Sequence, residues 1–570
     1  MDRPTPFEAQ KQAVGGCLAE MFGLYAPRDF QLRAVARAVF YSYSVLVVQK
    51  TGDGKSVVPL ATLMMRGGVA IIVVPLLTIG AGQAAAANAM SEDLDAFHWD
   101  DMNSAARKDL LARLDASSRD DKKRIALFVS PQAVDGANCP LRTAIVGLLA
   151  RDAVGVVAVD ELHRVPLDGI MFRKVFARLR ANLFDRLESS PRRVPVVGMT
   201  ATLPLDLQEQ FLAMSGVKFD VEERGDGRRR NIAISVRFNA TTATALKAFV
   251  VKHRKPEDED KDGVKVVLYS NHAKRMKNLT AVVEKVLPPG ENVSSVAGGT
   301  GGMMKSYITE AWRASLDPEA RTLEKINCTV LVATGAANCG LDCRDCGAVA
   351  REGPPAHLID LLQEMGRIRP QGYDYPYEYL IVLSVATWAA LLLRIETTED
   401  AGERKRQRGY LTVVLRLLVL QSGCIHAALE GAFGNPSVGV AAQAAQAAPC
   451  GDMCWNCNPG LTLDRGGRAE KEEVLRVLRV HFVKGSSPSQ AVVVAIHVDR
   501  AKIWPRQKTT TKQHANRLVL QLVASGILDF AVQRPKEGHR EVPGSIHLNW
   551  AVNEARGDFA HTEDALWTFL

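Results

Sequence analysis

The stretch VVQKTGDGKSVV, residues 47–58, decides how the front of the chain folds. A β-branched run ends at Gln49, and two glycines, a lysine and a serine separate it from a second apolar run. A strand, a glycine-rich turn and a helix in this order can cradle phosphate, because backbone N–H groups at the helix N-terminus point at the anion. Gly54, Lys55 and Ser56 fit the pattern Gly-x-x-x-x-Gly-Lys-Ser, whereas Gln49 replaces its first glycine. We expect a phosphate cradle here, and the alternative is a surface turn.

Short runs rich in valine and isoleucine recur on both sides of this loop. They are apolar throughout rather than alternating, which is typical of strands buried on both faces of a parallel sheet. Five of them precede residue 230, and they cover residues 44–49, 69–75, 125–130, 154–160 and 194–200. The sequence therefore predicts a parallel α/β sheet in this part of the chain.

A second series of such runs follows, over residues 264–270, 292–298, 328–334 and 377–384. Between the two series lies the charged segment 251–263, which we expect to be a solvated loop. The fold class is therefore α/β, with two parallel-sheet lobes and a change of lobe near residues 222–240. After about residue 396 the pattern becomes helical, and a smaller α+β unit begins near residue 466.

Composition limits the class of protein. The chain has 570 residues, 47% of them hydrophobic and 24% charged, which is ordinary for a globular protein of about three to four domains. We expect no transmembrane helix, since the apolar runs are too short, and no signal peptide, so the protein should be intracellular. The net charge of +8 is compatible with nucleic acid as a partner. Ten cysteines without a secretory signal favour thiols or metal ligands over disulfides.

Two carboxylates follow a buried strand in VGVVAVDELHRV, residues 154–165. Asp160 ends the apolar run and Glu161 comes next. Ligands of parallel sheets bind outside the carboxyl ends of the strands, so Asp160 could hold Mg²⁺ and Glu161 could activate a water molecule. The alternative is a solvated acidic turn, which the phosphate-loop pattern upstream makes the weaker interpretation.

The order of phosphate loop, DELH (residues 160–163) and TAT (residues 200–202) resembles that of superfamily 2 helicases, and more closely that of the RecQ family of DNA helicases. Further segments are similar to that family's motifs, in the family's order, over roughly residues 20–460. They are MFGLYAPRDFQLRAV (21–35), LFVSPQ (127–132), DELHRVPLDGIMFR (160–173), VLYSNHAKRMKNL (267–279), VLVATGAANCGLD (330–342) and LLQEMGRIRP (361–370).

The resemblance implies two RecA-like lobes that use ATP and Mg²⁺, and it implies roles for individual residues. Those implied to bind the nucleotide are Arg28, Gln31, Thr51, Gly52, Asp53, Gly54, Lys55 and Ser56. Those implied to be catalytic are Lys55, Asp160, Glu161, Gln363 and Arg367, with Ser56 and Asp160 as the Mg²⁺ ligands. Those implied to couple the nucleotide to DNA contacts are His163, Phe172, Arg173, Thr200, Thr202, Gly340 and Asp342.

The chain departs from the family pattern in two places. Arg369, the second arginine of GRIRP, stands one residue early. The family's aromatic-rich loop, which senses single-stranded DNA, has Gln, Trp and His where this chain has Leu167, Asp168 and Ile170. These departures put DNA-coupled unwinding in doubt and leave nucleotide binding intact. Asp53 is a further concern, because a carboxylate repels polyphosphate unless it points away.

Two cysteine clusters have the spacing of metal ligands. Cys450, Cys454 and Cys457, with Cys424 upstream, can form a tetrahedral Zn²⁺ site, and the RecQ zinc subdomain has a similar arrangement. The alternative is four free thiols. The rival cluster is Cys339, Cys343 and Cys346, which we expect to be coincidental thiols because Gly340 and Asp342 lie inside a motif that faces nucleotide and DNA.

The C-terminal unit has a helical pattern over residues 514–526, followed by the strand-like segments FAVQ and SIHLNW. With the basic connection RPKEGHREVPG (534–544), it resembles the family's winged-helix domain. Arg534, Lys536, His539 and Arg540 of this connection could touch DNA phosphates, and a solvated turn is an equal alternative for them. We therefore expect four domains: helicase lobe 1 (1–225), helicase lobe 2 (226–395), a RecQ-type zinc subdomain (396–462) and a winged-helix-like domain (463–570).

The sequence as a whole indicates an ATP-dependent helicase that acts on DNA, both single strands and duplex junctions, with ATP, Mg²⁺ and Zn²⁺ as cofactors. A 3′ to 5′ polarity comes only from the resemblance, and a nuclear location follows only from action on DNA. Two alternatives stay open: a DNA-stimulated ATPase that translocates without unwinding, and a non-catalytic DNA-binding remnant. An RNA helicase is a weaker hypothesis, because the zinc unit belongs with the DNA-acting family.

Overall fold

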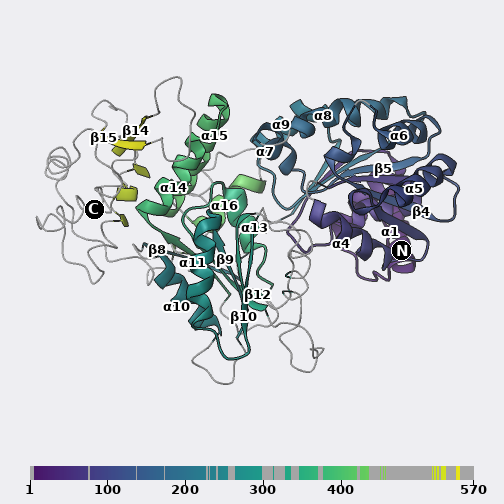
Figure 1. Ribbon diagram of the computed structural model, residues 1–570. Coiled ribbons are helices and arrows are strands. Elements are labelled where there is room, and N and C mark those ends of the chain that lie inside the picture. The colour runs from purple at the N-terminus through teal and green to yellow at the C-terminus, as the bar shows by residue number, and fades with distance from the viewer. Residues whose placement is uncertain are drawn as a thin grey trace, which may run out of the picture. The chain divides into compact units, whose positions relative to one another are not determined.

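Figure 1 shows the computed structural model of the chain. The residues that it describes are 5–74, 77–136, 138–171, 174–225, 229, 231–238, 242–254, 263–297, 308, 312, 328–335, 346–369, 377–419, 424–434, 450, 453–454, 456–457, 516–517, 519–521, 523–524, 528–533 and 547–552. They divide into two compact units. Lobe 1 holds residues 1–227, and lobe 2 holds nearly all of the chain from residue 228 onwards.

Lobe 1 is built on a seven-stranded sheet in which every paired strand is parallel to its neighbours. In spatial order its strands are β3 (Leu94–His98), β4 (Arg124–Val129), β2 (Val69–Val73), β5 (Val154–Val159), β6 (Val196–Thr200), β1 (Val45–Val48) and β7 (Val221–Arg224). The five strands predicted in this region are confirmed as β1, β2, β4, β5 and β6. The two that were not predicted, β3 and β7, are the two edge strands, whose partly exposed residues lack a continuous apolar run.

The helices of lobe 1 connect these strands (Figure 1). Those before β4 are α1 (Pro6–Phe22), α2 (Asp29–Phe40), α3 (Val57–Arg66), α4 (Leu77–Asn88) and α5 (Ser104–Ala116). Those after β4 are α6 (Pro140–Ala150), α7 (Arg164–Met171), α8 (Lys174–Asn182) and α9 (Leu205–Ser215), and three short 3₁₀ helices lie at Trp99–Asp101, Pro131–Val134 and Phe184–Ser189.

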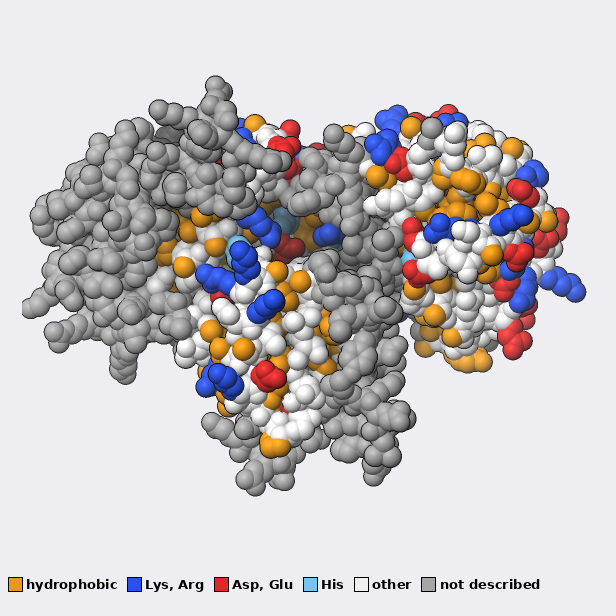
Figure 2. All heavy atoms as spheres, viewed as in Figure 1, with side chains coloured by type: hydrophobic (Ala, Val, Ile, Leu, Met, Phe, Trp, Pro, Cys, Tyr) orange, Lys and Arg blue, Asp and Glu red, His pale blue; other side chains and the backbone are white. Residues whose placement is uncertain are grey.

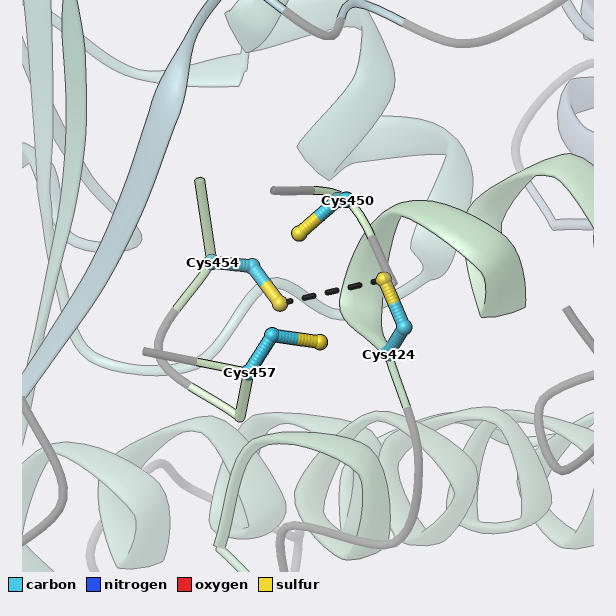
Figure 3. Close-up of side chains that lie close together, drawn as sticks. All are labelled: Cys424, Cys450, Cys454 and Cys457. Atoms are coloured by element: carbon cyan, nitrogen blue, oxygen red, sulfur yellow. Dashed lines mark hydrogen bonds between the residues drawn. The ribbon is translucent and has the colours of Figure 1, made fainter. Parts of the chain in front are cut away.

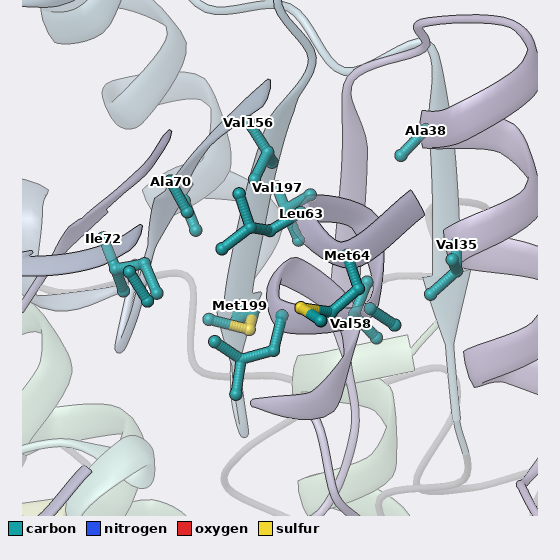
Figure 4. Close-up of a cluster of buried hydrophobic side chains, with 14 of the residues drawn as sticks. Val35, Ala38, Val58, Leu63, Met64, Ala70, Ile72, Val156, Val197 and Met199 are labelled. Carbon is teal, nitrogen blue, oxygen red and sulfur yellow. The ribbon is translucent and has the colours of Figure 1, made fainter. Parts of the chain in front are cut away.

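One large apolar core fixes α1, α2, α3 and α4 to the sheet (Figure 4). Helix α3 supplies Val58, Leu63 and Met64, all less than 9% exposed, and alternate residues of the strands face them. Since α3 is the helix that follows the phosphate loop, this burial anchors the loop at its downstream end. A buried leucine or valine side chain contributes about 1.5–3 kcal/mol relative to exposure, so several such residues hold the helix firmly.

Lobe 2 is built on a six-stranded sheet that is also parallel throughout. In spatial order its strands are β10 (Asn292–Val296), β11 (Cys328–Ala333), β9 (Lys265–Ser270), β12 (Cys346–Glu352), β13 (Glu378–Leu383) and β8 (Ala233–Phe238). Its helices are α10 (Thr242–Arg254), α11 (Ala273–Glu284), α13 (Leu358–Met365), α14 (Val385–Glu396), α15 (Ala401–Val419) and α16 (Ile425–Gly434). The four predicted strands are confirmed as β9, β10, β11 and β13, and β8 and β12 were not predicted.

The C-terminal part of lobe 2 contains an antiparallel pair of strands, β14 (Leu528–Gln533) and β15 (His547–Val552), as the sequence predicted for a hairpin. The basic connection between them, residues 534–546, lies outside the described residues. Asn516 accepts a hydrogen bond from the backbone N–H of Val385 at 2.9 Å, so the preceding helical segment contacts α14. In the part of the chain that the structure describes, no helix combines the length and the apolar character that a membrane crossing would need.

Helix α10 runs four residues further than the sequence predicted, because 251–254 had been assigned to a solvated loop. The helix continues to Arg254 because its last two residues, His253 and Arg254, are buried against partners in the lobe. Arg254 forms a two-pronged ion pair with Glu291, at 2.8 and 2.5 Å, and His253 Nε2 lies 3.3 Å from the carboxylate of Glu378. Residues 255–262 lie outside the described residues. Buried ionic partners thus explain why the charged composition misled the sequence prediction.

The carboxylate of Glu378 joins α10 to the sheet. It accepts hydrogen bonds from Lys252 Nζ at 2.6 Å and Ser235 Oγ at 2.8 Å. Burial alone would raise the pKa of Glu378, but the hydrogen bonds from His253 and Lys252 outweigh it and lower the pKa to about 2. Because this value lies below the pKa of a glutamate in an unfolded chain, the ionised form stabilises the fold above about pH 5. That contribution is lost as the pH falls through about 2.

We predict that Glu378→Gln lowers the free energy of unfolding by about 3 kcal/mol at pH 7. The loss should shrink as the pH is lowered from about 5 to about 2, because the native carboxylate then becomes protonated as well. Urea denaturation of both proteins across this pH range measures the difference. Glu284→Gln, at an exposed position of α11, is the matched control and should follow the native curve. A difference between Glu378→Gln and native protein that does not vary with pH would contradict the prediction.

Candidate functional site

The loop after β1 depends on two glycines in the left-handed region, Gly52 at φ 90° and Gly54 at φ 77°. At Gly54 a side chain would also collide, since its Cβ would lie 2.7 Å from Gln31 Nε2. That amide nitrogen donates to the Gly54 carbonyl oxygen at 2.9 Å. The loop therefore approaches α2 closely, and only glycine allows both the conformation and the approach.

Lys55 and Ser56 lie where the loop meets α3. The Lys55 ammonium donates to the carbonyl oxygens of Gln49 and Lys50, both at 2.9 Å, so the side chain lies across its own loop. Ser56 is the N-cap residue of α3, and its side chain makes no capping hydrogen bond. The ammonium, the hydroxyl and the first N–H groups of α3 are thus grouped at one helix N-terminus, where an anion is stabilised.

The residues implied to contact the base also shape this loop. The backbone N–H of Arg28 donates to Gln31 Oε1 at 2.8 Å, and the Arg28 guanidinium forms an ion pair with Asp53. This pair answers the concern about Asp53, because an arginine neutralises the carboxylate within the loop. Thr51 and Gly52 complete the turn between β1 and α3.

Gln49, which replaces the first glycine of the phosphate-loop pattern, is 9% exposed. Its Nε2 donates to the Glu223 carbonyl oxygen of β7 at 3.2 Å, and a Cβ on Gly225 would lie 2.2 Å from its Oε1. Gln49 therefore connects the start of the loop to the edge strand β7 through a hydrogen bond.

Asp160 and Glu161 follow β5 directly. Asp160 is 8% exposed, and its Oδ1 accepts a hydrogen bond from the Glu161 N–H at 2.9 Å. Its Oδ2 accepts from Gln83 Nε2 of α4 at 2.6 Å. Glu161 has φ 44°, which is the left-handed region and costs a non-glycine residue free energy. Sequence reasoning missed Gln83, whose only signal is its position on the helix that follows β2, the strand paired with β5.

His163, Thr200 and Thr202 form one buried hydrogen-bonded chain. Thr200 Oγ1 donates to the Thr202 carbonyl oxygen at 2.8 Å and accepts from the Thr202 N–H at 3.1 Å. Since its single proton is used there, the 2.8 Å contact with His163 Nδ1 requires the histidine N–H to donate. His163 Nδ1 also lies 3.4 Å from a carboxylate oxygen of Glu161, so the chain links β6 to the acidic pair.

The strand order brings these groups to the same edge of the sheet. Strand β6 pairs with β1 on one side and with β5 on the other. Neighbouring strands lie about 4.8 Å apart, so the carboxyl ends of β1 and β5 lie about 10 Å apart with Thr200 between them. Asp160 and Ser56 carry a carboxylate and a hydroxyl at this edge, which are oxygen groups of the kind that Mg²⁺ prefers.

In lobe 2, Gln363 lies on α13 and Arg367 follows that helix, and they are 5% and 8% exposed. Arg367 contacts Tyr269 of β9: burial raises the pKa of this tyrosine, and the positive charge of the Arg367 guanidinium opposes the rise. Arg369, the arginine that stands one residue early, donates from its NH1 to the Gly366 carbonyl oxygen at 2.8 Å. Its guanidinium is therefore bonded to the end of its own helix.

A buried ion pair supports α13 from the sheet. Arg351 of β12 donates to Glu364 Oε1 at 2.6 Å, and the Tyr379 hydroxyl donates to Glu364 Oε2, also at 2.6 Å. Burial raises the pKa of Glu364 to about 7, against the opposing effect of Arg351. Glu364 lies between Gln363 and Arg367 in the chain, so this pair fixes the segment that carries both.

Four of the predicted site residues, Phe172, Arg173, Gly340 and Asp342, lie outside the described residues. The same is true of Cys339 and Cys343 in the rival cysteine cluster, whereas its third member, Cys346, is buried at the start of β12.

Cys424, Cys450, Cys454 and Cys457 come together in lobe 2 (Figure 3). Their sulfur atoms all lie within 4.8 Å of one another, and those of Cys424 and Cys454 are 3.9 Å apart. Four sulfurs bound tetrahedrally to Zn²⁺ at about 2.3 Å would lie about 3.8 Å apart. The hydrogen bond between Cys424 and Cys454 lowers the pKa of Cys424 and raises the pKa of Cys454, so without a metal the pair shares one thiolate. The four residues therefore fit a structural zinc site.

The cysteine cluster is attached to the edge of the lobe 2 sheet. Ile234 of β8 forms a parallel β-bridge with Cys454, and its N–H donates to the Met453 carbonyl oxygen at 2.8 Å. His426, two residues after Cys424, lies with its Nε2 3.1 Å from the Ile232 carbonyl oxygen. The cluster thus occupies hydrogen-bonding positions that the edge strand would otherwise leave open.

Comparison with known proteins matches the fold. Residues 28–211 match the family model described as DEAD/DEAH box helicase. The ATP-dependent DNA helicase RecQ of Haemophilus influenzae is 22% identical over 534 residues, which cover 92% of this chain and 77% of that protein. The RecQ of Synechocystis is 23% identical over 419 residues, 72% of this chain and 77% of that protein. A solved structure of the DUF1998 helicase MrfA bound to DNA shares the fold, with a TM-score of 0.50 and 13% identity over 96% of this chain and 68% of that one.

These similarities and the two parallel-sheet lobes define the class: residues 28–211 form a DEAD/DEAH box helicase domain. Within that class the chain as a whole is similar to the RecQ helicases of superfamily 2.

We predict that Cys454→Ser removes bound zinc and lowers the midpoint of thermal unfolding, because three thiolates and a hydroxyl no longer complete the tetrahedral site. Native protein should carry about one zinc per chain, measured by elemental analysis, and the variant well under half of that. Cys17→Ser, which changes a half-buried thiol of α1 outside the cluster, should keep both values. Equal zinc content in native protein and Cys454→Ser would contradict the assignment.

Proposed function

We propose that this protein is an ATP-dependent DNA helicase, which couples ATP hydrolysis to movement along DNA and to strand separation. The observation that carries the proposal is the placement of the Lys55–Ser56 loop and the Asp160–Glu161 pair at one edge of the lobe 1 sheet. The similarity to RecQ relatives supports DNA as the substrate and suggests a 3′ to 5′ polarity.

The residues of lobe 1 have separable tasks in this proposal. Lys55 would exchange its two carbonyl partners for the terminal phosphates of ATP, and Ser56 and Asp160 would hold Mg²⁺. When bound, Mg²⁺ neutralises phosphate charge and offers an electrophilic centre. Glu161 orients the attacking water and takes its proton. Arg28, Gln31, Thr51, Gly52, Asp53 and Gly54 shape the nucleotide-binding loop.

Lobe 2 contributes the remaining charge. In the proposal Gln363 and Arg367 bind the γ-phosphate, and an arginine in this role is worth about 10³–10⁵ in rate in comparable enzymes. His163, Thr200 and Thr202 relay the nucleotide state to DNA contacts, since they form one hydrogen-bonded chain with the acidic pair. Phe172, Arg173, Gly340 and Asp342 complete the coupling set.

Basic side chains support contacts with DNA phosphates. Figure 2 shows Lys and Arg gathered on the visible face of lobe 2, over α11. Lys274 and Lys277 of this helix are exposed. Such residues fix the position of a nucleic acid without reading its sequence.

The domain division belongs to the same proposal. Residues 1–225 and 226–395 are the two helicase lobes, 396–462 hold a structural zinc through Cys424, Cys450, Cys454 and Cys457, and 463–570 form a winged-helix-like domain. An intracellular location, in the nucleus where the cell has one, is also part of it.

A second candidate is a DNA-stimulated ATPase that translocates without unwinding. Two observations favour it: Leu167, Asp168 and Ile170 replace the family's loop residues, and Arg369 is bonded to its own helix. A third is a non-catalytic DNA-binding remnant.

We predict that native protein hydrolyses ATP faster with single-stranded DNA than without it, and that Lys55→Ala lowers both rates by about 100-fold or more. Phosphate release, with and without single-stranded DNA, measures this. Lys108→Ala, on the exposed side of α5, is the matched control and should behave as native protein.

Background rates in native protein under both conditions would remove both enzyme proposals and leave the DNA-binding remnant. DNA-stimulated hydrolysis without separation of a forked duplex would select the translocase.

A further inference from the structure

Gln83 of α4 contacts the acidic pair from outside the sequence motifs. Its Nε2 lies 2.6 Å from Asp160 Oδ2. A carboxylate accepts hydrogen bonds only, so the amide nitrogen must face Asp160 and Gln83 Oε1 must face away. The contact fixes the orientation of the amide without further assumption.

Both oxygens of Asp160 are therefore held. Oδ1 accepts from the Glu161 N–H at 2.9 Å and Oδ2 accepts from Gln83, so the plane of the carboxylate is set by two donors. Each oxygen keeps a further lone pair. A carboxylate prepared in this way can bind a cation without losing side-chain freedom at that moment.

The second observation concerns the oxygen atom of the Gln83 amide. Gln83 Oε1 is buried and has no hydrogen-bond partner among the described residues. Buried acceptors are normally satisfied, so an acceptor without a donor beside a carboxylate points to a ligand that brings O–H groups. Hydrated Mg²⁺ is such a ligand, because it keeps several of its waters when proteins bind it.

A glycine of α4 allows this helix to lie close to β3. Gly80 lies three residues before Gln83, on the same side of the helix. A Cβ at Gly80 would lie 2.3 Å from the ring of His98, which hydrogen-bonds through Nδ1 to Asp101 at 2.7 Å. Only glycine lets α4 come this close to β3. By contrast, a Cβ at Gly82 would meet nothing within 4 Å.

We propose that Gln83 is a positioning residue for the metal: it holds Asp160 through Nε2 and accepts a hydrogen bond from a Mg²⁺-bound water through Oε1. Gly80 sets the distance at which it does so. This inference rests on the proposed nucleotide site of lobe 1.

The test is a Mg²⁺ titration of nucleotide binding, followed by the fluorescence of a labelled ADP, on the full chain. Loss of such a partner typically weakens metal affinity by 10–100-fold, so Gln83→Ala should need about 10-fold more Mg²⁺ for half-maximal enhancement of binding. Affinity for the nucleotide in EDTA should stay at the native value. Gln83→Asn, one methylene shorter, should behave in the same way.

Two glycine variants of α4 form a matched pair. Gly80→Ala should raise the Mg²⁺ requirement, because the added methyl group moves the helix away from His98. Gly82→Ala and the exposed Gln12→Ala should leave it at the native value. Thermal unfolding of each variant shows whether it folds. If Gln83→Ala does not fold, the Mg²⁺ requirement of Gln83→Asn and Gly80→Ala tests the inference instead.

The outcomes separate this inference from the proposed function. If native protein shows no Mg²⁺-dependent nucleotide binding, the proposed site itself fails. If native protein shows it and the folded Gln83 variants have the native Mg²⁺ requirement, Gln83 has no role toward the metal. Equal weakening with Mg²⁺ and in EDTA would mark a general structural effect and would likewise overturn the inference.

Discussion

The alignment of parallel strand ends in lobe 1 is the constraint on which the rest depends. Strand β6 separates β1 from β5 and ends in Thr200, so the glycine loop and Asp160 emerge at the same edge of the sheet. Moving a strand by one place in this order would separate the ammonium from the carboxylates by a further strand width. The apolar core beneath α3 and the left-handed glycines of the loop serve to keep that edge fixed.

The parts of the fold that the sequence predicted are those with continuous apolar runs. All nine strands predicted for the two parallel sheets were found, since burial on both faces imposes such runs. The strands that the sequence did not predict lack a continuous apolar run, for one of two reasons. β3, β7 and β8 lie at sheet edges, and β12 carries Arg351 and Glu352, which have the buried partners Glu364 for Arg351 and Thr242 and Ser270 for Glu352. A single sequence does not show a charge partner that lies far along the chain.

Part of the candidate site could likewise be predicted from the sequence, and part could not. Motif spacing placed Lys55, Ser56, Asp160 and Glu161 on loops at strand ends, and the structure has them there. It did not reveal that Arg28 neutralises Asp53, nor that Gln83 holds Asp160. These contacts join residues 25 and 77 positions apart, and no local pattern encodes them. Sequence reasoning therefore finds the residues that carry the chemistry more readily than those that orient them.

The attachment of the cysteine cluster to β8 affects how long an edge strand stays exposed while the chain is being made. An outermost strand with open N–H and C=O groups is a template onto which another copy can add. Residues 453–454 cover part of that template through Ile234. During synthesis β8 emerges from the ribosome some two hundred residues before Cys454. The outer edge of β8 therefore stays unpaired until residues 453–454 have been made. Until then the open edge of β8 can pair with another newly made chain.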